Sequence, residues 1–203
     1  MKDPISKREK THALILRVAA RQFADKGYAA TSMETLAKAC KLTKGALYDH
    51  FNGKADVYLK SISSYLSASL KEIDEKSRCR PDDSAERRVF VYIEQMLKAL
   101  NEDRVMRRLL LRLLIEADAD SAAPVVKNVL AASFNRFREL LQQYRPEINA
   151  RDYTYSFFCN AILGEDLRKW ADILTPETSS LDTSETLIAH FRNSLNAGSR
   201  HVK

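Results

Sequence analysis

Residues 31–51 read TSMETLAKACKLTKGALYDHF, two short helical patterns separated by one turn. Apolar residues recur three or four positions apart at Met33, Leu36 and Cys40, which is the spacing of a buried helix face. A second short helix is predicted after residue 43, with Leu47 and Phe51 on its inner face. Two short helices joined by a turn of three or four residues are typical of a helix-turn-helix, whose second helix reads DNA.

The segment before this pair predicts a third helix and a sharp boundary. Leu16, Ala20 and Phe23 repeat at helical spacing, and Gly27 follows as a helix C-terminal glycine should. Thr31 and Glu34 have the spacing of a capping box, which predicts that the next helix is capped by Thr31.

Positive charge is concentrated at the same end of the chain. Residues 1–60 contain 12 Lys and Arg against 6 Asp and Glu, whereas residues 61–203 contain 21 of each sign. A local positive field attracts a polyanion, and double-stranded DNA is the candidate partner. Charge alone leaves a solvated lysine-rich surface as an equal alternative, so the residue pattern inside the block decides between them.

The composition predicts an all-α protein of about nine helices. The chain has 203 residues, of which 45% are hydrophobic, with only 5 Gly and 5 Pro. Nearly every segment has helical periodicity. We expect a helix-turn-helix domain at 1–53 and an effector-binding and dimerisation domain at 54–203. The expected helices are three within the first 51 residues and then 54–76, 84–102, 103–118, 124–143, 150–174 and 184–196, with a break at 120–124.

Several function classes are disfavoured. No apolar run is long enough for a membrane span, and the first residues lack a secretory signal pattern. The three cysteines are scattered, which supports neither a disulfide framework nor a metal site. We therefore expect a reduced cytoplasmic protein with no cofactor and no membrane partner. Enzyme motifs such as H-E-x-x-H or a phosphate-binding glycine loop are missing from the sequence, so an enzyme on this scaffold ranks far behind a DNA-binding protein.

An extended pattern at the N-terminus resembles the TetR family of bacterial transcription regulators. The residues that carry the resemblance are ILRVAARQF at 15–23, Gly27, TSMETLA at 31–37, LTKGALYDHF at 42–51, and Lys54. The resemblance implies an all-helical homodimer with an N-terminal DNA-binding domain and a C-terminal domain that binds a small-molecule effector. Weaker similarity over 107–114 and 164–170 is to the AcrR-like regulators of multidrug efflux.

The resemblance also implies which residues contact DNA. Thr31 and Ser32 would offer hydroxyl and backbone N–H groups to phosphate. Lys44 and Gly45 would enter the major groove, and Lys54 would hold a phosphate. The full implied set is Thr31, Ser32, Thr43, Lys44, Gly45, Ala46, Tyr48, His50 and Lys54.

Some of these residues have a structural alternative. Thr31 could serve only as a helix cap, and His50 could be a half-buried structural histidine. Asp49 lies among the contacts, where a carboxylate is repelled by phosphate. It either accepts from a cytosine amino group or faces away, and it is left out of the set.

The C-terminal residues predict architecture better than chemistry. For each one, ordinary core packing is the alternative. Candidate effector-lining residues are Tyr65, Tyr92, Gln95, Met96, Met106, Phe134, Phe158, Asn160 and Trp170. Candidate dimer-interface residues are Phe157, Ala161, Gly164, Leu187, Phe191 and Leu195, on the last two long helices.

The expected activity is a ligand-responsive repressor that binds a palindromic operator as a dimer and is released by a small molecule. The 54–76 helix would connect the DNA-binding end to the effector cavity. A protein of the same fold that organises the nucleoid or acts in cell division is the alternative from a different class.

Overall fold

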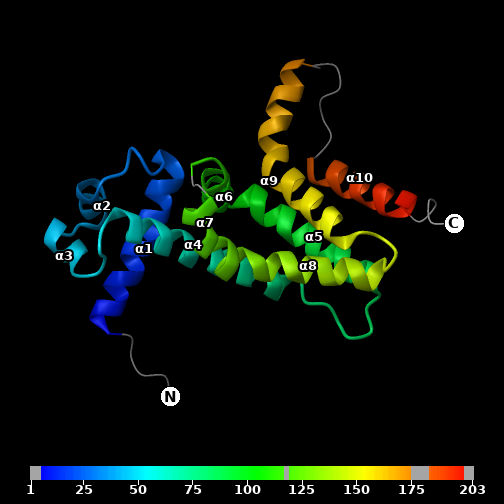
Figure 1. Cartoon of the computed structure of the whole chain (residues 1–203), viewed down its shortest axis with the longest axis horizontal. Helices are drawn as coiled ribbons and strands as arrows, with labels where there is room; N and C mark the ends of the chain where they lie inside the picture. The colour runs from blue at the N-terminus through cyan, green and yellow to red at the C-terminus, as the bar shows by residue number, and fades with distance from the viewer. Residues whose placement is uncertain (1–5, 117–118, 175–182, 199–203) are drawn as a thin grey trace. The chain divides into compact units, whose positions relative to one another are not determined.

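The structure is a computed structural model that describes residues 6–116, 119–174 and 183–198. Within these ranges the regular secondary structure is helical and contains no strand, which confirms the all-α prediction. The elements, shown in Figure 1, are α1 (Lys7–Lys26), α2 (Met33–Cys40), α3 (Lys44–Tyr48), α4 (Lys54–Lys76), α5 (Ala85–Glu102), α6 (Arg104–Glu116), α7 (Ala119–Val125), the π-helical segment η1 (Val126–Leu130), α8 (Ala131–Tyr144), α9 (Ala150–Leu174) and α10 (Thr183–Gly198).

The predicted helices lie within a few residues of the observed ones, with one correction. Residues 120–124 were expected to separate two helices, but α7 runs through them and contains Pro124. The wider turns of η1 follow at Val126 and lead directly into α8. A proline removes one backbone donor and crowds the carbonyl four residues earlier, and a π-helical insertion is one way a helix absorbs such a defect. The sequence predicted that Pro124 interrupts the helix, whereas the helix continues through this residue.

The helices group into two compact units. The first contains Met1–Ser69 and Val105–Leu130, and the second contains Leu70–Arg104 and Ala131–Lys203. Helix α4 therefore begins in the first unit and ends in the second. These compact units are not the predicted functional domains, and the boundary between residues 53 and 54 stays a prediction.

The core of the first unit is made by α1, α2, α3, the residues directly after α3, and the start of α4. Phe23, Leu36, Leu47 and Phe51 are buried, as the apolar spacing predicts. Tyr58 of α4 packs edge-on against Phe23, with ring centroids 4.9 Å apart. Burying side chains of this size stabilises a unit by roughly 1.5–3 kcal/mol each, so the core fixes the backbone of α2 and α3 firmly.

The second unit is built around aromatic side chains from α5, α8, α9 and α10. Phe137 stacks on Tyr92 at 5.3 Å and contacts Phe157 at 4.6 Å, and Phe191 lies 5.6 Å from Phe157. The Tyr92 hydroxyl pairs with the Ser133 hydroxyl at 2.5 Å. Burial raises the pKa of Tyr92 to about 12, although its bond to Ser133 opposes the shift. The unit has a closed aromatic core with its polar atom satisfied.

Candidate nucleic-acid interface

The turn between α2 and α3 sets the position of α3. Lys41 adopts the left-handed conformation (φ 57°, ψ 41°), and the N–H of Leu42 donates to the carbonyl of Ala37 at 2.9 Å. The Thr43 hydroxyl then accepts from the N–H of Ala46 at 3.1 Å and begins α3. A left-handed residue followed at once by a helix cap reverses the chain within three residues, so α3 is held by hydrogen bonds at its start.

The start of α2 corrects the predicted capping box by one residue. Ser32 is the cap, its hydroxyl accepts from the N–H of Thr35, and the Thr35 hydroxyl accepts from the N–H of Ser32 in return. Thr31 is instead buried, and its hydroxyl donates to the carbonyl of Gly27 at 2.8 Å. The side chain of Thr31 thus ties the α1–α2 loop together, and Ser32 is the residue that faces solvent.

The remaining candidate contacts differ in exposure. Thr43, Lys44 and Gly45 are exposed at the start of α3, and 49% of Tyr48 is exposed at its end. Ala46 and His50 are half-buried. Arg8 of α1 donates to the carbonyl of Asp49 at 3.3 Å and so lies beside the same surface. Thr43, Lys44, Gly45 and Tyr48 are thus exposed together on α3 and its cap, and we call these four residues the α3 surface.

Gly45 has no structural reason to be glycine. A Cβ built on it would meet only the Thr43 Oγ1 atom, at 4.0 Å, which is an ordinary contact. Its backbone is helical, and glycine in a helix is less favourable than alanine by up to about 1 kcal/mol. Nothing within the described chain accounts for this residue, so the reason for it is sought in a partner that approaches the α3 backbone.

Lys54 is held inside the protein more firmly than the sequence suggests. Its ammonium group donates to the carbonyl of Tyr28 at 2.7 Å and lies 4.1 Å from the centre of the Tyr28 ring. Lys54 therefore anchors the α1–α2 loop to the start of α4. Any phosphate contact must use the donors of Lys54 that this bond leaves over.

Two residues of α6, Arg112 and Glu116, bond to the end of α1 and to the loop that follows it. The Arg112 guanidinium donates to the carbonyls of Ala24 at 2.9 Å and Asp25 at 3.1 Å, and it pairs with Glu116. Glu116 in turn accepts from the N–H of Tyr28 at 3.2 Å. The last carbonyls of α1 carry partial negative charge, so a guanidinium there is well placed.

Two further residues complete this arrangement. Arg108, one turn earlier on α6, pairs with the carboxylate of Asp25 at 2.6 Å. Gly27 has φ +80°, and a Cβ there would overlap the Arg112 guanidinium, so the approach requires glycine. We call Arg108, Arg112 and Glu116 the α6 clasp. Sequence reasoning missed it because its partners are more than 80 positions away and no local pattern marks them.

The candidate effector residues fall into both units. Tyr65 and Met106 belong to the first, whereas the others belong to the second. Tyr92, Met96 and Met106 are buried, Phe134 and Phe158 stack at 5.8 Å, and Gln95 is half-buried. Asn160 is exposed and donates to the carbonyl of Ser156. The side chain of Trp170 lies outside the described residues. An effector role for this set stays a prediction.

Most of the candidate dimer residues are covered within their own chain. Phe157, Ala161, Phe191 and Leu195 are buried, Leu187 is half-buried, and Phe191 takes part in the aromatic core. A Cβ at Gly164 would meet nothing within 4 Å. Their burial within one copy agrees with ordinary core packing, the alternative given for these residues, and their role in a dimer stays a prediction.

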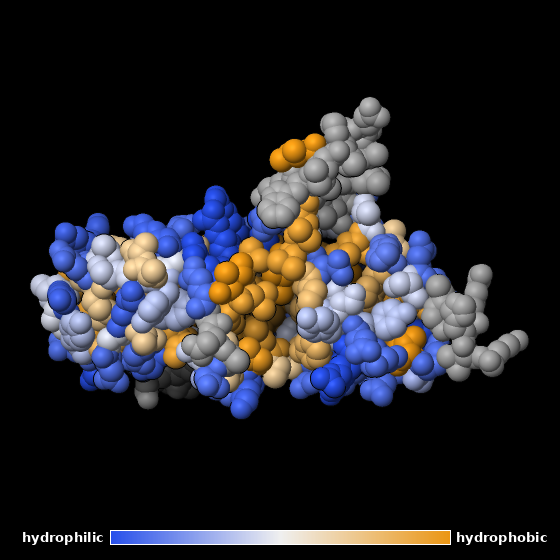
Figure 2. All heavy atoms as spheres, turned by 45° about the horizontal axis from the view of Figure 1, so that its top comes forward, coloured by the Kyte–Doolittle hydropathy of each residue, from blue (hydrophilic) through white to orange (hydrophobic). Residues whose placement is uncertain are grey.

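A different stripe of α9 is left uncovered. Tyr155 (67% exposed), Leu163 (39%), Leu167 (54%) and Ile173 (77%) lie on one side of the helix, because at 100° per residue they fall within about 120° of each other. The end of α9 projects beyond α8 and α10 in Figure 1, and apolar surface is visible on it in Figure 2. We call these four residues the α9 stripe. Exposed large apolar side chains in a row mark an interaction surface.

A helix-turn-helix with an exposed, cap-ordered second helix on a cationic segment defines a DNA-binding transcriptional regulator. Residues 15–60 match the model of the family described as bacterial regulatory proteins, tetR family. Residues 15–60 thus carry the DNA-binding region of the TetR family, which confirms the resemblance over this part of the chain.

Relatives support this assignment over different lengths. The chain is 36% identical to the HTH-type transcriptional regulator YerO of Bacillus subtilis over 70 residues, which cover 33% of this chain and 24% of YerO. It is 26% identical to the HTH-type transcriptional regulator AcrR of Shigella flexneri over 142 residues, 66% of this chain and 64% of AcrR. The chain thus spans about a quarter of YerO and less than two thirds of AcrR.

Solved structures share the fold over nearly the whole chain. The fatty acid degradation regulator FadR from Bacillus halodurans matches with a TM-score of 0.67 at 18% identity, covering 94% of this chain and 96% of FadR. A tetR-family regulatory protein from Rhodococcus RHA1 matches with a TM-score of 0.69 at 19% identity, covering 92% and 96%. In the described part of this chain, no helix is long and apolar enough to cross a membrane.

Proposed function

We propose that this protein is a cytoplasmic repressor that binds a near-palindromic operator as a homodimer and is released by a small molecule. In this proposal residues 1–53 bind DNA, and residues 54–203 dimerise and bind the effector. The observation that carries it is the α3 surface, where Lys44, Gly45 and Tyr48 are exposed on a helix held in place by its caps.

The chemistry of the α3 surface suits the major groove. Lys44 supplies a cationic donor for a guanine edge or a phosphate, and Gly45 lets the helix backbone approach base edges. Tyr48 offers a hydroxyl for phosphate and a ring for a thymine methyl group. Ser32 presents a hydroxyl near the start of α2, where a phosphate is also favoured. Thr31 contributes by ordering the loop, since its own hydroxyl is already bonded to Gly27.

The α9 stripe supports the dimer. One short reading helix covers only half an operator, so two copies joined by a two-fold axis are needed to bind with useful affinity. A four-residue apolar stripe on a projecting helix is suited to pack against its symmetry mate. Gly164 lies on the same helix and would allow close approach of the partner backbone.

The α6 clasp and Lys54 support a release mechanism. Both hold Tyr28 and the loop that precedes α2, one from α6 and one from the start of α4. A ligand that shifts α4 or α6 would therefore change the position of α2 and α3. The coupling must come from different ligand affinities in the two states, typically about 1–3 kcal/mol. The effector is a mostly apolar small molecule, in keeping with the Tyr, Phe and Met side chains of the candidate set.

The experiment that tests this function is selection of DNA sequences from a random pool by the purified protein, followed by mapping of its binding sites in the genome. We expect a near-palindrome whose half-site centres are separated by roughly one helical turn or a multiple of it, found at one or a few promoters. Many dispersed sites without a promoter bias would favour the nucleoid-organising alternative instead.

A further inference from the structure

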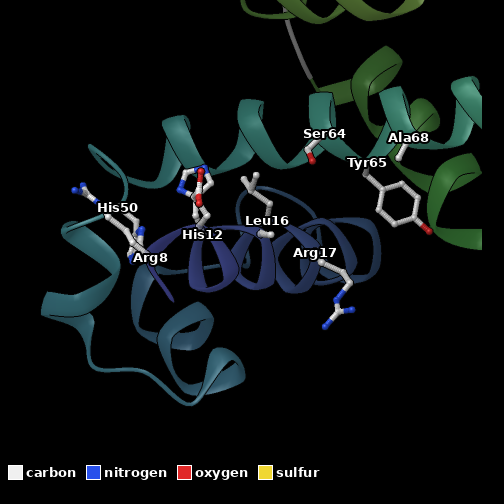
Figure 3. A pocket seen from close by; sticks show the side chains of 10 residues that line it. Arg8, His12, Leu16, Arg17, His50, Ser64, Tyr65 and Ala68 are labelled. Carbon is white, nitrogen blue, oxygen red and sulfur yellow. The ribbon is translucent and has the colours of Figure 1, made fainter. Parts of the chain in front are cut away.

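A groove runs between α1 and α4 within the first unit, and its lining includes Leu16 of α1 and Ser64, Tyr65 and Ala68 of α4 (Figure 3). Its volume is about 620 Å³, which lies within the range of sites that bind small molecules. The groove lies in the unit that carries the α3 surface, and only His50 and Tyr65 of its lining belong to the candidate contacts described above.

The groove exists because small side chains stand where the two helices face each other. Ala13 of α1 and Ser64 and Ala68 of α4 leave space, while Leu16 and Tyr65 form apolar walls. Ser64 and Ala68 are four positions apart and so lie on the same side of α4. The interior is therefore mostly apolar and suits a hydrocarbon or aromatic body.

One end of the groove is cationic. Arg8, His12 and His50 meet there, and the rings of His12 and His50 are 5.8 Å apart. Arg17 adds a further guanidinium along α1. The only carboxylate among the lining residues is that of Glu9, and it already accepts from the N–H of Ser6 at 2.8 Å.

We propose that this groove binds a small amphipathic carboxylate. Its anionic group lies between Arg8 and the two histidines, and its apolar body follows Leu16 toward Tyr65. The positive charge of the cationic end selects an anion. The small side chains of Ala13 and Ala68 set the width available to the apolar part of the ligand. This site shares Tyr65 with the candidate effector set, but its anion-binding end, at Arg8, His12 and His50, lies outside that set.

The surroundings of His12 agree with this arrangement. Desolvation lowers the pKa of His12, and the positive charges of His50, Lys60 and Arg8 lower it further, against the opposing charge of Asp56. The imidazole ring stacks on Phe51, with the ring centroids 4.6 Å apart. A bound anion supplies the missing negative charge, so binding strengthens as the pH falls and the imidazole protonates.

Octanoate is the probe, and octanol and octylammonium are its neutral and cationic counterparts. Each compound is titrated into the full-length protein. The imidazole resonances of His12 and His50 are followed by NMR. We expect saturable shifts with octanoate, binding at least about tenfold weaker for octanol, and no binding of octylammonium at this site. Arg8→Gln and His12→Gln should each weaken octanoate binding several-fold.

Ala68→Trp fills the groove and should abolish the imidazole shifts, whereas Ala132→Trp, at an exposed alanine of α8, should leave them unchanged. Equal affinity for octanoate and octanol would overturn the proposal. So would imidazole shifts that persist in Ala68→Trp, or octanoate binding that leaves both imidazoles unaffected. DNA binding is not part of the readout, so the outcome is independent of the proposed repressor function.

Discussion

Both units of this protein bury aromatic side chains in their cores, but they expose different candidate interaction surfaces. The first unit packs Phe23, Leu47 and Phe51 inside and presents Lys44 and Tyr48 on a short, hydrogen-bonded helix. The second unit closes its aromatic core and leaves the apolar α9 stripe uncovered. The α3 surface of the first unit suits a polyanion, and the α9 stripe of the second suits an apolar partner, although the first unit also exposes Leu114, Ile115 and Val126.

The helical glycines Gly45 and Gly164 differ from Gly27 in whether the chain's own packing requires a glycine. Gly45 and Gly164 both lie in helices, and a Cβ on either would find open space or only a distant contact. By contrast, Gly27 is required by its positive φ and by the nearby Arg112 guanidinium. The chain's own packing does not require glycine at either helical position, which fits the close approach of DNA at Gly45 and of a second copy at Gly164 that we propose.

The largest effect is expected inside the second unit. Phe191→Ala should lower the free energy of unfolding by about 3–5 kcal/mol, because it leaves a cavity beside Phe137 and Phe157. Urea unfolding followed by circular dichroism measures this. A loss of less than 1 kcal/mol would mean that Phe191 is not in the core and that α10 faces elsewhere.

Substitutions in the α9 stripe should change the oligomeric state and leave the free energy of unfolding unchanged. We expect the double substitution Leu163→Asp and Leu167→Asp to convert the dimer to a monomer without lowering the stability of the chain, since both side chains are exposed in one copy. Sedimentation velocity reads the oligomeric state. Val126→Asp, at an exposed apolar residue outside the stripe, is the control and should stay dimeric. A double variant that remains dimeric would place the interface on another surface.

The clasp can be tested with two arginines one turn apart. Arg112→Met keeps the alkyl stem and removes the bonds to the end of α1, so we expect a loss of about 1–3 kcal/mol and faster hydrogen exchange at residues 24–28. Arg108→Met removes an ion pair whose Asp25 partner is largely exposed and should lower stability by less than about 1 kcal/mol. Equal losses of stability in the two variants would mean that the hydrogen bonds of Arg112 to the α1 carbonyls stabilise the protein no more than the exposed ion pair of Arg108 does.

A smaller effect concerns pH. The folded protein holds the pKa of His12 below its ordinary 6.5, mainly through desolvation. Below about pH 6.5 the unfolded chain therefore binds more protons than the folded one, and the contribution of His12 to stability is lost as the pH falls. His12→Gln should reduce the drop in stability between pH 7 and pH 5.5. An identical drop in the variant would assign the pH dependence to other groups.

Local patterns predicted the helices and the first core well. The repeat at Met33, Leu36 and Cys40 is itself the buried face of α2, and Gly27 ends α1 as expected. The cap of α2 was displaced by one residue because Thr31 and Ser32 can both cap a helix, and only the loop geometry shows that Thr31 bonds back to Gly27.

Contacts between distant residues were beyond reach of the sequence. Nothing in the spacing of Glu116 or Lys54 indicates that both bond to the backbone of Tyr28. Nor could periodicity say which of two apolar stripes on α9 is buried, because each has helical spacing. The buried stripe is set by the aromatic side chains of α8 and α10 that pack on Phe157.

The most direct measurement of the central claim, that the α3 surface meets DNA, is Gly45→Ala. The variant should be more stable by about 0.5–1 kcal/mol, because alanine is the better helix residue and its Cβ has room. It should bind the selected operator about tenfold or more weakly, since a lost base-edge approach is worth roughly 1–3 kcal/mol. Gly164→Ala, assayed as the dimer, should gain stability without losing DNA affinity. A Gly45→Ala protein that is more stable and binds the operator as tightly as the wild type would contradict the account.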